Sequence, residues 1–181
     1  MVSPPDKLSV VEYFTLEETL RPMELVYGVV VREPAMPGWS HQLLSARLTA
    51  LLYAHVEELG IGQVSSPVDV VLDAEAALVV QPDIVFISHA RRDIVRDRIW
   101  GAPDLVVEIL SPSTARRDRT IKLAWYRRYD VRECWLVDLA SRAVEVVELR
   151  STTPARRFIG PEPIRSSVLP RWTLSTDRIF A

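Results

Sequence analysis

The stretch GAPDLVVEILSPST (residues 101–114) decides how this chain folds, because it places one carboxylate inside an otherwise apolar run. Side chains in a β-strand alternate between two faces, so Glu108 shares one face with Asp104 and Val106, and the residues between them point to the other. A strand that is apolar on both faces is typical of the middle of a covered sheet. Burying an ionised carboxylate without a partner is strongly unfavourable, so Glu108 requires a compensating cation.

A second Pro-Asp dipeptide lies in QPDIVFI (residues 81–87). Pro82 cannot donate a hydrogen bond to a sheet, so it marks the start of a strand or a bulge and places Asp83 near the mouth of the sheet. Two carboxylates from adjacent strands can hold Mg²⁺ or Mn²⁺, which prefer oxygen ligands. At this point two interpretations stay open: the acids are structural, or they share a ligand such as a metal ion.

Hydrophobic periodicity predicts a long helix over residues 40–60, with Ser40 as N-cap and Gly60 as C-cap. Shorter helices are expected over residues 10–18 and 114–129. Strands are expected over residues 23–33 (two strands around Gly28), 64–73, 77–88, 104–110, 132–138 and 143–150, the last two as a hairpin.

This order of elements predicts a domain of the α/β (α+β) class, a central mixed β-sheet flanked by α-helices. At 181 residues and 48% hydrophobic content, the chain is expected to form a single domain over residues 1–181. Residues 1–9 are expected to form a flexible lead, and residues 151–181 to wrap the edge of the sheet.

Composition narrows the class of protein. The one cysteine excludes an internal disulfide and a cysteine-based zinc cluster, and the three histidines have no HxxH-type spacing. The first residues have neither a basic nor an apolar leader region, and no apolar run approaches 18 residues. We therefore expect a soluble, cytoplasmic protein that does not bind a membrane.

The segment STARRDRTIKLAWYRRY (residues 113–129) carries a lysine after the two acids. Helical spacing places Asp118, Lys122 and Tyr126 (or Tyr129) along one side of the predicted helix. Two interpretations stay open, since Asp118 and Lys122 match an ordinary surface pair, and Lys122 also suits a site that must orient a nucleophile.

The start of the same helix carries two further expectations. Ser113 or Thr114 would cap it, and its N-terminus beside Arg116 and Arg117 could receive a phosphate of a nucleic acid. The plainer interpretation of these residues is a helix cap alone.

Together these residues resemble the Uma-two restriction endonuclease family, a branch of the PD-(D/E)xK nuclease superfamily. The resemblance rests on QPDIVFI, on GAPDLVVEILSPST, and on the RDR, Lys, Tyr and WLVD that follow. It also takes in MELV and Gly within residues 23–28, SHQ at residues 40–42 and DRIF at residues 177–180. It thus spans nearly the whole chain.

The resemblance implies a restriction-endonuclease-like core and a role for each matched residue. Asp83 takes the place of the first metal-binding acid and Glu108 that of the second. Leu110 stands where the superfamily has its lysine, and the lysine is then supplied by Lys122 from the following helix. Glu24 matches an acid of the early hairpin and would be an extra metal or water ligand.

The function implied is a metal-dependent endonuclease that hydrolyses DNA with Mg²⁺ or Mn²⁺, with the Ile109 carbonyl completing the metal site and Lys122 assisting the attacking water. A homodimer is expected, because cutting both strands calls for two sites. Two alternatives stay open. One is a catalytically inactive nuclease-fold protein that binds nucleic acid or serves in assembly. The other is an oligomeric interaction protein in which Asp83 and Glu108 pair with buried arginines.

Overall fold

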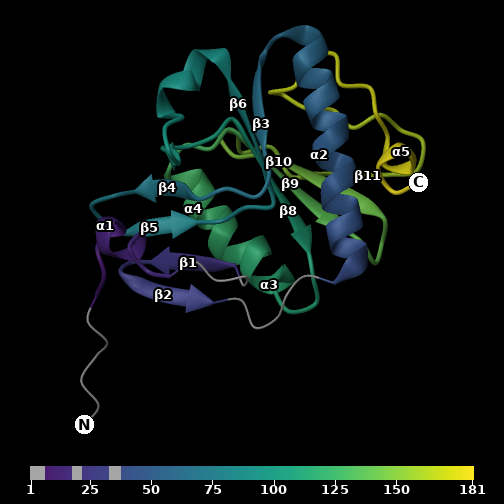
Figure 1. The fold of residues 1–181 in the computed structure, drawn as a ribbon. Coiled ribbons are helices and arrows are strands. Elements are labelled where there is room, and N and C mark those ends of the chain that lie inside the picture. Colours follow the sequence, from purple (N-terminus) through teal and green to yellow (C-terminus); the bar gives the residue numbers. More distant parts are fainter. Residues whose placement is uncertain (1–6, 18–21, 33–37) are drawn as a thin grey trace.

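The computed structural model describes residues 7–17, 22–32 and 38–181, which contain two β-sheets (Figure 1). In the larger sheet β8 and β9 run parallel and the other neighbouring strands run antiparallel. The mixed sheet predicted from the sequence is therefore confirmed. Its strands, in spatial order, are β11 (Arg156–Ile159), β10 (Ala143–Glu148), β9 (Glu133–Asp138), β8 (Leu105–Leu110), β6 (Ile84–Ser88) and β3 (Gly62–Ser65).

The smaller sheet shows where the strand prediction is wrong. Its strands, in spatial order, are β2 (Val29–Arg32), β1 (Met23–Val26), β5 (Leu78–Val80), β4 (Val70–Asp73) and β7 (Ile99–Trp100). Residues 64–73 and 77–88 were each expected to stay within one strand, but each segment divides between the two sheets. Pro67 and Pro82 lie at the two divisions, where a residue without an N–H ends the pairing.

Helix α2 (Trp39–Leu59) covers one face of the larger sheet (Figure 1). Its buried residues recur every four positions, from Leu44 to Val56, and pack on the face that includes Val107 of β8. Gly60 ends the helix with φ +57°, as predicted, because glycine adopts this left-handed conformation without strain. The predicted N-cap is wrong: Gly38 occupies that position, and Ser40 lies inside the helix.

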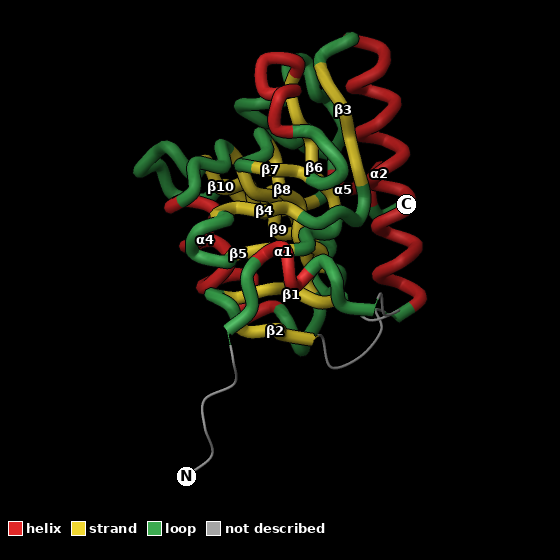
Figure 2. The backbone as a smooth tube through the Cα atoms, turned by 60° about the vertical axis from the view of Figure 1, so that its left-hand side comes forward, coloured by secondary structure: helices red, strands yellow, loops and turns green. Residues whose placement is uncertain are grey.

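The opposite face is covered by one continuous helical stretch and by the smaller sheet (Figure 2). The stretch consists of α3 (Ala115–Arg117), the π-helical turn η2 (Asp118–Lys122) and α4 (Leu123–Arg128), so the helix predicted over residues 114–129 is confirmed. Thr114 occupies its N-cap position, although its side chain makes no capping hydrogen bond. Layers on both faces of β8 are what its two apolar faces require.

The two ends of the chain pack onto these layers. Helix α1 (Val10–Tyr13) starts at a capping box between Ser9 and Glu12, and the Leu8 amide donates to the Gly28 carbonyl. Residues 7–9 of the predicted lead thus contact the hairpin and cap α1, and flexibility of the lead stays a prediction. Residues 1–6, and residue 18 of the predicted helix, lie outside the described ranges.

Two short elements complete the description. The 3₁₀-helix η1 (His89–Ile94) follows β6. Helix α5 (Thr176–Ile179) packs near α2, and buried side chains of the C-terminal segment, such as Ile164 and Trp172, join the core on that side. The segment after β10 thus adds an edge strand and also contributes to the main core.

Candidate active site

Glu108 lies in the middle of β8 and is buried, with 3% of its surface exposed. Its neighbours Val106 and Leu110 belong to the core on the α4 side, and Val107 and Ile109 belong to the core on the α2 side. The alternation predicted for this strand is therefore confirmed. Glu108 points toward the helical stretch that carries Lys122.

Lys122 is the cationic partner of Glu108. Its Nζ donates to both carboxylate oxygens, at 2.9 Å from Oε1 and 3.0 Å from Oε2. The hydroxyl of Tyr126, one turn further along the same helix, also donates to Oε1. A lysine from the following helix therefore does reach the acid.

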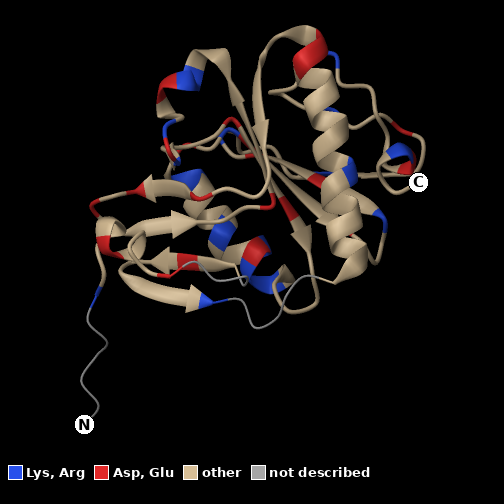
Figure 3. Ribbon diagram, in the orientation of Figure 1, with Lys and Arg blue, Asp and Glu red and all other residues tan. Residues whose placement is uncertain are grey.

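Two more carboxylates gather around the same ammonium group. Lys122 Nζ lies 3.2 Å from Glu24 Oε1 and 3.8 Å from Asp118 Oδ1, and both acids are buried. Glu24 also accepts from the Gln81 amide at 3.1 Å and forms an ion pair with Arg117. Figure 3 shows the acidic and basic segments that meet where β1, β8 and the helical stretch approach one another.

Asp118 and Lys122 are the first and last residues of a π-helical turn, and both side chains point inward. This turn spans residues 118–122 and contains one residue more per turn than an α-helix, which widens the backbone. Both side chains are about 4% exposed, so the interpretation as an ordinary surface pair is wrong. Single π-turns within α-helices occur frequently at functional sites.

Asp83 lies immediately before β6, at the point where the chain passes from the smaller sheet to the larger one. Ile84 pairs with Val107 in the antiparallel ladder, so the same register continued by one residue places Asp83 opposite Glu108. Asp83 Oδ2 accepts from the Ile109 amide at 2.7 Å. The two acids predicted to share a ligand therefore lie opposite each other on neighbouring strands, where β6 begins.

His41, near the start of α2, completes this end of the site. Its Nε2 lies 3.0 Å from the Ile109 carbonyl oxygen and 3.5 Å from Asp83 Oδ1. Neither spacing nor composition pointed to His41, because 68 residues separate it from Ile109 in the chain. Only its place in the SHQ match at residues 40–42 hinted at a role.

Burial and charge set the protonation of this cluster. Burial raises the pKa of Glu108 to about 8, and the neighbouring Asp118 and Asp83 add to this against the opposing charge of Lys122. Burial also raises the pKa of Asp118. Burial alone would raise the pKa of Glu24, but the charges of Lys122 and Arg117 outweigh it and lower the pKa.

The neighbouring carboxylates raise the pKa values of the two basic residues, Lys122 and His41. Burial disfavours charge on Lys122, but the carboxylates of Glu108, Glu24 and Asp118 hold its pKa well above the ordinary value. Burial also opposes the charged form of His41, and the hydrogen bond and charge of Asp83 outweigh it and raise the pKa. The site therefore holds a lysine whose charged form is favoured beside a glutamate whose pKa is raised to about 8.

The residues expected to contact a phosphate group lie in different surroundings. Arg117 is turned into the site by its ion pair with Glu24. Arg116 and Ser113 are exposed at the start of the helical stretch, and Thr114 is half-buried and hydrogen-bonded with Ser111. Arg116 and Ser113 are thus the members of this set that present polar groups to solvent.

A cation would find oxygen donors at this end of the sheet. In the described part of the chain, no three His, Cys, Asp or Glu side chains are grouped so as to hold a metal ion. Mg²⁺ does not require such a group, because it is commonly bound through one or two carboxylates and keeps several waters. The Asp83 carboxylate and the Ile109 carbonyl, which converge on one atom of His41, fit this pattern of donors, with Glu108 adjacent.

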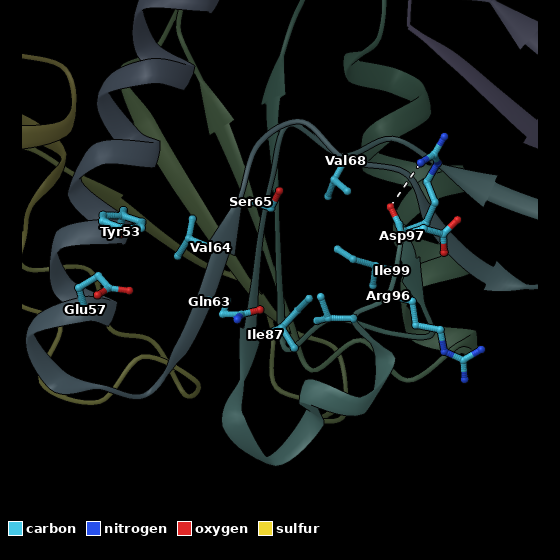
Figure 4. Close-up of a pocket in the computed structure, with 12 residues that line it drawn as sticks. Tyr53, Glu57, Gln63, Val64, Ser65, Val68, Ile87, Arg96, Asp97 and Ile99 are labelled. Carbon is cyan, nitrogen blue, oxygen red and sulfur yellow. Dashed lines mark hydrogen bonds between the residues drawn. The ribbon is translucent and has the colours of Figure 1, made fainter. Parts of the chain in front are cut away.

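A cavity of about 500 Å³ lies elsewhere, between α2, β3 and the segment that leads into β7 (Figure 4). Its lining includes Tyr53, Gln63, Ile87 and Arg96, and it includes none of the acids around Lys122. No helix in the described ranges is long and apolar enough to cross a membrane.

A solved structure and a family model both match this chain. A crystal structure titled as a "putative nuclease belonging to DUF820", from Anabaena variabilis ATCC 29413, superimposes with a TM-score of 0.80. The two chains are 20% identical, and the match covers 96% of this chain and 97% of that one, which shows that the fold is shared. No functionally curated protein matches the chain. The family model described as "Uma2: Putative restriction endonuclease" matches residues 10–177, and the chain therefore belongs to the Uma2 family.

Proposed function

We propose that this protein is a metal-dependent endonuclease that hydrolyses phosphodiester bonds of DNA. The observation that carries the proposal is the placement of Asp83 opposite Glu108 where β6 begins, with Lys122 bonded to both oxygens of Glu108. The family match supports a nuclease, and the geometry supplies groups that such a reaction requires.

In this proposal Asp83 and Glu108 hold Mg²⁺ or Mn²⁺ together with the carbonyl oxygen of Ile109. A bound cation would supply charge for the scissile phosphate and lower the pKa of a coordinated water. The protein must hold its two acids rigidly for this purpose. The Ile109 amide fixes Asp83, and β8, buried on both faces, fixes Glu108.

Lys122 orients the attacking water and offsets the negative charge that develops on the phosphate. Its high pKa keeps it protonated, so it acts as a hydrogen-bond donor and a fixed charge. Tyr126 positions Glu108 by donating to Oε1. Arg116, exposed near the start of the same helical stretch, supplies a contact to the DNA backbone.

Glu24 has a different part in this proposal from the one expected from the sequence. Its oxygens contact the Gln81 amide, Lys122 and Arg117. We propose that Glu24 holds the ammonium group of Lys122 toward Glu108, as a positioning residue. Its expected role as an extra metal or water ligand stays a prediction.

The alternative based on buried arginines has little support in the geometry. Asp83 contacts His41 and the Ile109 amide, and Glu108 contacts Lys122 and Tyr126, so none of these described partners is an arginine. Asp104, at the other end of β8, is the acid that pairs with arginines, through Arg132 and Arg91.

A cleavage assay tests the proposal. Supercoiled plasmid and single-stranded DNA are incubated with Mg²⁺ or Mn²⁺ and the purified protein, beside Asp83→Ala, Glu108→Ala and Lys122→Ala. Glu58→Ala, at an exposed position on α2, is the control and is expected to cleave like the wild type. Loss of cleavage in the three site variants, with circular dichroism unchanged, supports the assignment. Activity retained in all three would refute it, and a wild type that binds DNA without cutting would favour the inactive alternative.

A further inference from the structure

His41 is joined to the two oxygens that the proposed function assigns to the metal. Its Nε2 lies 3.0 Å from the Ile109 carbonyl oxygen and 3.5 Å from Asp83 Oδ1. The ring is largely buried, with 12% of its side chain exposed, so its orientation is fixed by packing. A single nitrogen thus faces both oxygen donors.

These separations match those of ligands around one small cation. In octahedral coordination at 2.0–2.1 Å, two ligands at right angles lie roughly 3 Å apart. The nitrogen lies at this distance from one oxygen and slightly beyond it from the other. A cation between the three atoms would replace the proton by which Nε2 now bonds the carbonyl.

The helix that carries His41 supports such a role. The imidazole projects from the first turn of the 21-residue helix α2, whose buried stripe anchors it on the sheet that carries Ile109. Neither ring nitrogen is held by a protein group that would turn it away from the oxygens: Nδ1 is buried and has no hydrogen-bond partner among the described residues.

We propose that His41 is a third protein ligand of the metal, through Nε2, beside the carboxylate of Asp83 and the carbonyl of Ile109. This inference rests on the proposed function and deepens it by assigning a metal preference. Imidazole nitrogen suits transition metals better than Mg²⁺, whereas an all-oxygen site suits both Mg²⁺ and Mn²⁺. The site should therefore bind Mn²⁺ more tightly than Mg²⁺, and His41 should be the source of the difference.

The chain contains a matched control on the same helix. His55 Nε2 also lies 3.0 Å from a main-chain carbonyl oxygen, that of Pro170, and no acid is paired with its ring among the described contacts. His55 therefore serves as a reference histidine that bonds a carbonyl oxygen without a neighbouring acid. His41→Asn and His55→Asn therefore remove the same kind of hydrogen bond, but only the first removes the proposed ligand.

The test measures bound Mn²⁺ directly, without DNA or turnover. Electron spin echo modulation of Mn²⁺ bound to the wild type should show coupling to ¹⁴N, and the coupling should change to that of ¹⁵N in protein labelled at histidine. His41→Asn should lose the coupling, bind Mn²⁺ at least about tenfold more weakly and bind Mg²⁺ nearly unchanged. His55→Asn should behave as the wild type in all three measurements.

The outcomes separate this inference from the function on which it rests. Mn²⁺ that binds in an Asp83-dependent manner without nitrogen coupling would overturn the role of His41 and leave the metal-dependent nuclease intact. Absence of Mn²⁺ binding at Asp83 and Glu108 would overturn both. If His41→Asn fails to fold, the isotope exchange in the wild type still decides, because coupling that persists unchanged in labelled protein excludes a histidine ligand.

Discussion

Two buried glutamates lie on the same parallel strand pair and are held in opposite ways. Glu133 begins β9 opposite Leu105, and Glu108 lies three residues further along the pair, opposite Leu136. Glu133 is fully buried and accepts four hydrogen bonds from uncharged donors: Trp135 Nε1, the Ser166 hydroxyl, and the amide and hydroxyl of Ser167. Glu108 is instead bonded to a lysine that it shares with two other acids.

The difference teaches how to separate a structural acid from a functional one. Glu133 ties the C-terminal segment to the sheet, and its hydrogen bonds use both oxygens. The cluster around Glu108 contains four carboxylates, those of Glu24, Asp83, Glu108 and Asp118, against three basic groups, those of Lys122, Arg117 and His41. Such an excess of negative charge is unfavourable unless a further cation joins it.

The largest expected contrast is in catalysis. Glu108→Gln should lower the rate of DNA cleavage at least about 1,000-fold, because one electrostatic group aimed at the reacting phosphate is lost. Glu133→Gln should change the rate of the folded fraction less than about threefold, because it lies away from the cluster. Single-turnover cleavage, corrected for folded protein, measures both. Equal losses in the two variants would contradict the contrast.

The second contrast is in stability, where Glu133→Gln is expected to have the larger effect. Glu133→Gln should lower the free energy of unfolding by about 2–3 kcal/mol, because an amide nitrogen then faces buried donors that lose their acceptor. Glu108→Gln should change it by less than about 1 kcal/mol, because the amide relieves the crowding of like charges. Urea unfolding with EDTA gives both values, and a larger loss for Glu108→Gln would show that the cluster is mainly structural.

The pH dependence of stability sharpens the description of Glu108. Its pKa is about 8 in the folded protein and near 4.5 in the unfolded chain, so the folded state keeps a proton that the unfolded state releases. This contribution is complete below pH 4.5 and is lost as the pH rises through 8. The wild type should therefore lose stability relative to Glu108→Gln between about pH 5 and 8. Parallel curves in urea titrations would contradict the raised pKa, and Glu58→Gln serves as the control.

The smallest expected contrast is again in stability, between a variant that removes one hydroxyl donor to Glu133 and one that removes the hydroxyl donor to Glu108. Ser166→Ala should cost about 1–2 kcal/mol of stability, because it removes one of four neutral donors to Glu133 and also the acceptor of the Val168 and Leu169 amides. Tyr126→Phe should cost less, about 1 kcal/mol, because Lys122 still donates to the same oxygen of Glu108. Urea unfolding of both variants decides the order, and the reverse order would make Tyr126 the main support of Glu108.

Much of the fold followed from local patterns in the sequence. The apolar alternation around Glu108 predicted a strand covered on both faces, and the four-residue stripe predicted α2, because these periods depend only on backbone geometry. The division into two sheets was missed at Pro67 and Pro82. Each proline marked an interruption, but nothing local states which partner the next strand will find.

The part of the site that is formed by strands and a helix that follow one another in the chain was predictable from the sequence. Asp83, Glu108 and Lys122 lie within 40 residues, and the structure brings them together. The burial of Asp118 was not predictable, because helical spacing placed it beside Lys122 without stating whether that side of the helix packs on the sheet. His41 was missed for another reason: its contact joins residues 68 positions apart and exists only after α2 docks.

The π-helical turn at residues 118–122 also sets how far the residues after it are rotated about the helix axis relative to those before it. An α-helix advances about 100° per residue, so the extra residue rotates everything after the turn relative to everything before it. Arg117 before the turn then reaches Glu24, and Tyr126 after it reaches Glu108. Deleting the exposed Ile121 would restore a regular helix and swing the two ends out of phase. For this reason a loss of one residue here should harm the site more than most substitutions on its surface.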